Sequence, residues 1–179
     1  MATQRTTKAA APARKPNAPT KKLGATRSPA KPAKLSDYEG ARQLLSRYCA
    51  YIDQGKLVEL SELFHLKATF SVSFDNTPSH VGRAAILAWY SDFFKPRRGK
   101  FRYPRHKLFE PYLVVAGNTA IASSYFDSDF VEASGEVRIL AGRYDDVLIK
   151  ERGQWLFKAR TITVCYHYSP GKGQEGMTQ

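Results

Sequence analysis

Apolar residues follow helical spacing in the first part of the body of the chain and strand spacing in most of the rest. A first helix is predicted from Ser36 to Gly55, because Ser36 and Glu39 form a capping-box pattern and a glycine often follows a helix C-terminus. A short second helix is predicted over 56–64, and a third, apolar over much of its circumference, over 82–94. The apolar stripe predicted for the first helix consists of Tyr38, Ala41, Leu44, Leu45, Tyr48, Cys49 and Ile52.

Strand periodicity first occurs over 68–74, where every second residue is apolar. Longer strands follow the third helix and are joined by tight turns that contain glycine; they are predicted over 105–115, 119–132, 137–150 and 154–168. Three helices followed by long antiparallel strands predict one α+β domain, over residues 36–170. A strongly bent sheet that wraps the helices would enclose a pocket.

Positive charge is concentrated at the N-terminus. Residues 1–35 contain nine of the 28 Lys and Arg residues, none of the 16 Asp and Glu residues, and half of the ten prolines. Because this segment also has almost no large apolar residues, it cannot bury enough surface to offset the entropy of ordering. We therefore expect residues 1–35 to form a disordered tail, and we expect a second flexible segment over 171–179. The tail is compatible with contact to nucleic acid or another polyanion, with an organelle transit peptide, and with a solubilising extension.

Several classes of protein and site are not indicated. No apolar run approaches the roughly 18 residues of a membrane span, and no secretory signal is recognisable, so we expect a cytoplasmic protein. Cys49 and Cys165 are expected to be small hydrophobic residues rather than a disulfide or zinc pair. Asp127 and Asp129 share one face of a strand, but no histidine or further acid has matching spacing. We therefore expect a solvated face there, and no metal or cofactor.

The order of these elements resembles the SnoaL-like group of the NTF2-like superfamily over residues 37–168. The resemblance is carried by the segments YIDQGKLVELSELF, FSVSF, GRAAILAWY, RHKLFEP, AGNTAIASSYF and AGRYDDVLIKERGQWLFKARTI. It implies a cone, in which helices lie across the mouth of a curved mixed sheet. Relatives include scytalone dehydratase, bile-acid dehydratase, a dehydrochlorinase and polyketide cyclases. They also include non-catalytic dioxygenase β subunits and nuclear transport factor 2, so the fold alone does not choose a function.

The resemblance also implies a catalytic pair. In dehydratase-like relatives an aspartate at the end of the first helix orients a histidine on a later strand, and Asp53 and His106 occupy these two places. A carboxylate that accepts the imidazole N–H makes the other ring nitrogen a better base. Such a base can remove a proton next to a carbonyl and return it to a departing hydroxyl. Alternatively, Asp53 bonds a nearby backbone or arginine, and His106 is satisfied by a neighbour.

Other residues are expected to bind or stabilise the substrate. Tyr48, whose spacing from Asp53 matches the bile-acid dehydratase type, is expected to bind the carbonyl, and Arg160 to stabilise developing negative charge. Further substrate contacts are predicted from Tyr51, Arg143, Trp89 and Phe70. The alternative is that the tyrosines belong to the core and that both arginines pair with Asp145 or Asp146 across a hairpin.

These inferences favour a cofactor-free lyase or isomerase, of the dehydratase or cyclase type, that acts on a cyclic, carbonyl-bearing hydrophobic molecule. The resemblance also implies a homodimer. The alternative is a non-catalytic module that binds a ligand or a partner, like a dioxygenase β subunit. Relatives often have a small amide residue a few positions after the histidine, where this chain has Glu110 and Pro111. This difference changes the polarity near the base. The many cations in KPRRGKFRYPRHK could attract an anionic substrate or a polyanion.

Overall fold

The computed structural model describes residues 36–172. Its elements, in chain order, are α1 (Asp37–Asp53), α2 (Leu57–Glu62), β1 (Phe64–Val72), β2 (His80–Val81), α3 (Arg83–Phe94), the 3-10 helix η1 (Lys95–Arg97), β3 (Phe101–Leu108), β4 (Tyr112–Ala116), β5 (Thr119–Glu132), β6 (Glu136–Glu151) and β7 (Gln154–Lys172). Residues 1–35, for which the sequence predicts a disordered tail, lie outside the described residues, as do residues 173–179 of the predicted flexible C-terminus.

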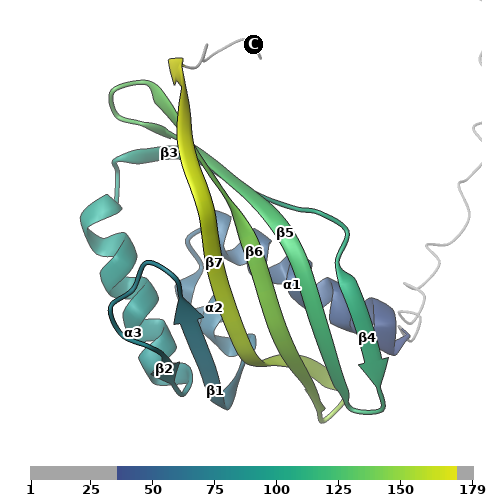
Figure 1. Cartoon of the computed structure of the whole chain (residues 1–179). Coiled ribbons are helices and arrows are strands. Elements are labelled where there is room, and N and C mark those ends of the chain that lie inside the picture. Colours follow the sequence, from purple (N-terminus) through teal and green to yellow (C-terminus); the bar gives the residue numbers. More distant parts are fainter. Residues whose placement is uncertain (1–35, 173–179) are drawn as a thin grey trace, which may run out of the picture. The chain divides into compact units, whose positions relative to one another are not determined.

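One curved, mixed sheet forms the framework, which confirms the predicted α+β class. Its strands run in the order β2-β1-β7-β6-β5-β3, and β4 also pairs with β5. The β1–β7 pair is parallel and the remaining pairs are antiparallel. In Figure 1 the long strands β5, β6 and β7 bend in front of α1 and α2, and α3 lies beside β1 and β2. The helices therefore cover one face of the sheet, and the core lies between the two layers.

Helix α1 contributes several buried residues to the core, and it begins and ends as predicted. The hydroxyl oxygen of Ser36 accepts a hydrogen bond from the backbone N–H of Glu39 at 3.1 Å. Gly55 has a φ of +67°, which only glycine adopts readily, and it ends the helical path just after Asp53. Asp53 therefore lies at the edge of the apolar core. The buried residues of the helix are Ala41, Leu44, Leu45, Tyr48 and Cys49.

The predicted strand over 105–115 is two strands in the structure. β3 pairs with the second half of β5, β4 pairs with the first half, and residues 109–111 separate them. Pro111 lies in this break because proline has no backbone N–H to donate to a sheet. The short strand β2, which pairs with β1, is not predicted by the sequence pattern.

Candidate active site

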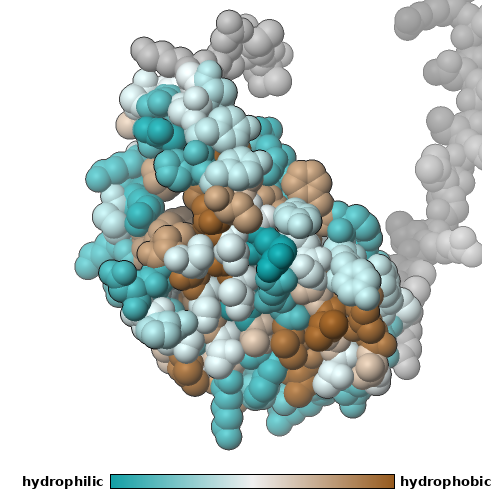
Figure 2. All heavy atoms as spheres, viewed as in Figure 1, coloured by the Kyte–Doolittle hydropathy of each residue, from teal (hydrophilic) through white to brown (hydrophobic). Residues whose placement is uncertain are grey.

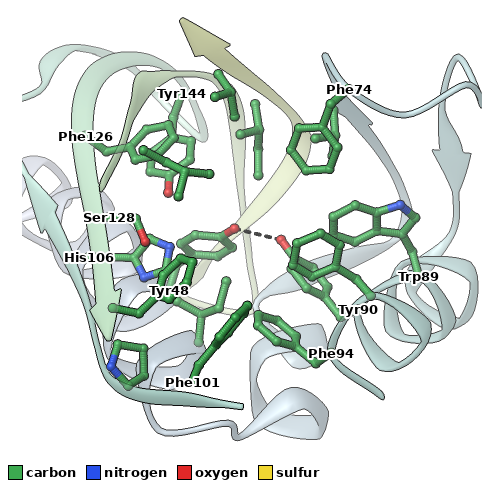
Figure 3. A pocket seen from close by; sticks show the side chains of 18 residues that line it. Tyr48, Phe74, Trp89, Tyr90, Phe94, Phe101, His106, Phe126, Ser128 and Tyr144 are labelled. Carbon is green, nitrogen blue, oxygen red and sulfur yellow. Dashed lines mark hydrogen bonds between the residues drawn. The ribbon is translucent and has the colours of Figure 1, made fainter. Parts of the chain in front are cut away.

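A cavity of about 110 Å³ lies between α1, α3 and the strands. Most of its lining is aromatic or aliphatic, and the polar side chains that reach it are Tyr48, Trp89, Tyr90, His106, Ser128 and Tyr144. Figure 3 shows His106 and Ser128 on one side of the cavity and Trp89 on the other, with the hydroxyls of Tyr48 and Tyr90 directed toward each other between them. An apolar hollow with a few convergent polar groups is the usual form of a small-molecule site.

The structure brings Asp53 into contact with His106, whose side chain lines this cavity. Asp53 Oδ1 lies 2.6 Å from His106 Nδ1, and Oδ2 accepts a hydrogen bond from the backbone N–H of His106 at 2.9 Å. An ionised carboxylate can only accept, so Nδ1 is the ring nitrogen suited to donate to Asp53, and in that neutral tautomer Nε2 is the basic nitrogen. Both side chains are largely shielded, with exposed fractions of 24% for Asp53 and 14% for His106.

A β-bulge in β3 aims His106 into the cavity. Arg102 lies opposite Val131 and Arg105 opposite Asp129, so β3 has one extra residue between these two pairs. In a regular strand alternate residues share a face, and His106 would point away from Phe101. The extra residue shifts this alternation, and Phe101, Pro104 and His106 all line the cavity.

The two central phenols form a hydrogen-bonded pair. The hydroxyl oxygens of Tyr48 and Tyr90 are 2.7 Å apart, and both side chains are buried. Burial raises the pKa of Tyr48, although the nearby Arg160 opposes this effect, and burial also raises the pKa of Tyr90. Burial likewise raises the pKa of Tyr144 well above its ordinary value. All three side chains are therefore neutral hydrogen-bond donors at physiological pH.

Arg160 lies behind the tyrosines and does not line the cavity. Its Nε and Nη2 atoms donate to the two carboxylate oxygens of Asp146 at 2.7 and 2.8 Å, and both residues are buried. Its guanidinium carbon lies 3.8 Å from the ring centroid of Tyr48 and 4.3 Å from that of Tyr144. Burial alone would lower the pKa of Arg160, but the Asp146 carboxylate raises it overall, so the cation persists. The geometry matches the pairing alternative, and we assign Arg160 to positioning Tyr48.

The other predicted substrate contacts separate into two groups. Trp89 lines the cavity. Phe70 is fully buried behind it, with ring centroids 4.9 Å apart, and Tyr51 packs against the core without lining this cavity. Arg143 lies on the exposed face of β6, where its Nε donates to Asp145 at 2.8 Å, so the strand's alternation directs it away from the cavity. Of these four residues, only Trp89 is placed to touch a ligand there.

A second aspartate–histidine pair, which the sequence analysis does not find, holds Trp89. The indole N–H of Trp89 donates to Asp75 Oδ2 at 2.5 Å, and His80 Nε2 lies 2.8 Å from the same oxygen. The backbone N–H of Thr77 donates to Asp75 Oδ1. These hydrogen bonds, that of Thr77 first and that of His80 next, lower the pKa of Asp75 to about 2. No pattern in the sequence indicates that Asp75 contacts an indole on a later helix. Likewise, none indicates that Tyr90 contacts Tyr48.

We expect Asp75→Asn to destabilise the protein at neutral pH and to have less effect as the pH falls from about 4 to about 2. Because the folded pKa is depressed from 3.8 to about 2, the carboxylate stabilises the fold fully above pH 4, and this stabilisation is lost toward pH 2. Urea unfolding of wild type and variant at several pH values measures this, with Trp89 fluorescence in a Trp155→Phe background as the signal. Asp92→Asn, at an exposed site on α3, is the control. A difference that is constant between pH 4 and pH 2 would contradict the assignment.

No group of three or more His, Cys, Asp or Glu residues suited to a metal ion occurs within residues 36–172. Asp129 is buried and binds Arg105 Nε at 2.8 Å and Lys107 Nζ at 2.6 Å, so the expectation of a solvated carboxylate is wrong for this residue. Cys49 is buried, Cys165 is exposed, and both are free thiols. None of the described helices is long and apolar enough to cross a membrane.

Comparisons with known proteins agree with the fold. A family described as the SnoaL-like domain matches residues 33–161. Among solved structures, a candidate scytalone dehydratase from Novosphingobium aromaticivorans is 20% identical, with a TM-score of 0.63 over 79% of this chain and 94% of that chain. The protein Aln2 from a Streptomyces species is 21% identical, with a TM-score of 0.62 over 71% of this chain and 89% of that chain.

An NTF2-like protein with a cystatin-like fold, also from Novosphingobium aromaticivorans, is 25% identical, with a TM-score of 0.58 over 72% of this chain and 82% of that chain. A search of curated proteins gives no match. At identities of 20–25%, likeness to a solved structure establishes the fold and leaves the chemistry to be argued from the site.

Proposed function

The chain belongs to the SnoaL-like domain family, and on that premise we propose that it is a lyase or isomerase of the dehydratase or cyclase type. Its substrate is a cyclic, hydrophobic molecule that carries a carbonyl group. The observation that supports this proposal is the 2.6 Å contact between Asp53 and His106, whose side chain lines an apolar cavity. The chemistry is carried by side chains and needs no cofactor.

In the dehydration version, His106 Nε2 removes a proton from the carbon next to the carbonyl. The electron pair of the broken C–H bond forms an enolate, and the Asp53 carboxylate stabilises the imidazolium. The imidazolium then returns the proton to a hydroxyl on the adjacent carbon as the C–O bond breaks, and water leaves. In the isomerase version the proton returns to a different carbon. In both, His106 ends in its starting state.

The phenol pair supplies a donor for the enolate oxygen. When one hydroxyl of the Tyr48–Tyr90 pair donates to the other, the accepting phenol keeps its own hydrogen for the substrate. The raised pKa values of both groups, caused mainly by burial, ensure that this hydrogen is present at neutral pH. A fixed donor in a cavity shielded from water stabilises developing negative charge more strongly than water does.

The alternative of a non-catalytic binding module requires no oriented base. The placement of His106 in the cavity lining, with its free nitrogen on a ring held by Asp53, favours catalysis. A cytoplasmic location and contact between the N-terminal tail and a polyanion stay predictions, and the tail lies outside the described residues.

The proposal is tested by hydrogen exchange, which does not require the natural substrate to be known. A panel of ring ketones with a hydroxyl on the second carbon from the carbonyl is incubated with the protein in D₂O, and NMR follows two signals. We expect protein-dependent exchange of the proton next to the carbonyl, and elimination of water, for at least one member. If no ring ketone in the panel exchanges faster with protein than without it, the lyase or isomerase assignment is wrong.

We also propose a homodimer that forms through the outer face of the sheet. Val114, Ile121 and Val147 are direct cross-strand neighbours on β4, β5 and β6, and each side chain is about half exposed. Figure 2 shows hydrophobic side chains gathered over this part of the molecule. An exposed apolar row of this kind commonly marks a contact surface.

Ile121→Lys is expected to weaken the dimer at least about tenfold, because burying an unpaired ammonium costs more than about 1.4 kcal/mol. Sedimentation velocity over a range of protein concentrations measures the change. Asp92→Lys, on the exposed side of α3, is the control and should leave the association unchanged. A wild-type protein that is monomeric at all concentrations would rule out this interface.

A further inference from the structure

A second cavity, of about 210 Å³, lies beside the first and shares five lining residues with it, including His106. Small-molecule sites usually occupy roughly 300–1,000 Å³, and neither cavity reaches that range alone. A ligand of ordinary size would therefore occupy both. Because His106 lines both cavities, such a ligand would pass the proposed base.

The second cavity differs from the first in its charge. Its charged side chains are Asp53, Arg97 and Arg98, whereas the first is lined by aromatic, aliphatic and neutral polar groups together with His106. Both oxygens of Asp53 already accept hydrogen bonds from His106. The two arginines therefore dominate the charge that a ligand would meet in this cavity, and an anionic group is favoured.

The turn that carries these arginines is held in place. A backbone N–H of Lys100 donates to the carbonyl oxygen of Arg97 at 3.0 Å, and Gly99 between them has a φ of +74°. The guanidinium of Arg97 lies 3.9 Å from the ring centroid of Phe93 and donates to the Phe93 carbonyl oxygen. Arg97 is thus partly fixed before a ligand binds, which lowers the entropy lost on binding. Arg98 is exposed.

Two further cations of the segment 95–107 form ion pairs on the other face of β3. Arg105 and Lys107 point to the opposite face of β3 from His106 and bind Asp129 at 2.8 and 2.6 Å. One buried carboxylate on β5 thus compensates part of the charge of these two cations. Of the cations in the segment 95–107, Arg97 and Arg98 are those that line the second cavity.

We infer that the substrate is an amphiphilic carboxylate. Its cyclic, carbonyl-bearing part occupies the apolar cavity, and its carboxylate lies in the second cavity against Arg97 and Arg98. This inference rests on the proposed function in that it takes the apolar cavity as the substrate site. A guanidinium suits a carboxylate because its planar N–H groups match the two oxygens. The reacting carbon would then lie between the two ends, near His106.

Calorimetric titration with a matched pair of compounds tests this. Benzoylpropionate and its primary amide have the same ring, ketone and chain, and they differ in charge. We expect wild type to bind the carboxylate about tenfold more tightly than the amide at low ionic strength, and the preference to shrink as salt is added. In the double variant Arg97→Ala/Arg98→Ala, the two compounds should bind equally.

Controls separate this inference from loss of fold and from the proposed function. Unchanged affinity for the amide shows that the double variant keeps the apolar cavity, and Arg105→Ala should retain the preference because that cation binds Asp129. Equal binding of both compounds by wild type, a preference that survives in the double variant, or no binding of either compound at millimolar concentration overturns the inference. His106→Ala should keep the charge preference while losing proton exchange, so the two proposals fail independently.

Discussion

His106→Ala is expected to lower kcat/KM by about 10²- to 10⁴-fold, the usual contribution of a positioned general base. The other titratable side chains in the lining of the apolar cavity are Tyr48, Tyr90 and Tyr144, whose raised pKa values, which result mainly from burial, keep them protonated. Among the described residues, the lining therefore offers no second base to replace the imidazole. The loss should appear mainly in kcat, because the base acts on the transition state and contributes little to binding.

Comparison with variants of Asp53 and His65 makes this measurement specific. Asp53→Asn should also lower kcat, because an amide can no longer stabilise the imidazolium as a carboxylate does. The double variant should be little worse than His106→Ala alone, since the two side chains act as one unit. His65→Ala is the matched control, because its imidazole pairs with Glu151 and lines neither cavity. Wild-type turnover by His106→Ala on a substrate found in the exchange screen would remove the proposed mechanism.

Arg160→Leu is expected to lower the free energy of unfolding by about 3–5 kcal/mol, because it leaves the Asp146 carboxylate buried without its partner. Asp146 and Arg160 are direct cross-strand neighbours on β6 and β7, and both are almost completely buried. The substitution also removes a cation that lies 3.8 Å from the Tyr48 ring centroid and 4.1 Å from that of Phe157. Equilibrium urea unfolding measures the change.

A similar arginine–aspartate pair on the outer face of the sheet is a close control. Arg143 and Asp145 form a contact of 2.8 Å, but their side chains are 46% and 40% exposed, so Arg143→Leu should leave the free energy of unfolding nearly unchanged. Replacing both members of the buried pair, as Arg160→Leu/Asp146→Leu, should restore much of the stability, because no charge is then left unpaired. Equal effects of Arg160→Leu and Arg143→Leu would show that burial of the first pair does not matter.

The alternation of residues along β6 explains why the sequence predicted these pairs but not their roles. Arg143 and Asp145 occupy alternate positions on one face, and Tyr144 and Asp146 occupy the other. The sequence therefore indicates which residues share a face, and pairing of Arg160 with Asp146 was one of its two alternatives. Which face meets the helices depends on packing across the whole sheet. That packing directs Arg160 into the core and Arg143 to solvent.

The orientation of His106 is a second feature that the sequence pattern did not predict. A single bulge at residues 102–105 reverses which face the following residues occupy, and one extra residue leaves almost no trace in apolar periodicity. The resemblance to a known family places His106 at the right position in the chain, but the bulge turns it toward Asp53. In a strand with regular alternation, the His106 imidazole would lie on the opposite face, away from the carboxylate.

By itself, the sequence determined the helices, most of the strands, the α+β class and the position of Asp53 at the end of α1, because spacing, caps and turns are properties of neighbouring residues. Tertiary structure alone decided that Tyr90 meets Tyr48, that Asp75 holds Trp89, and that Arg97 and Arg98 rather than Arg105 line the second cavity. Tyr90 and Tyr48 are 42 residues apart, and His106 and Asp53 are 53 apart. Contacts over such distances arise only when the curved sheet and its helices close on the same space.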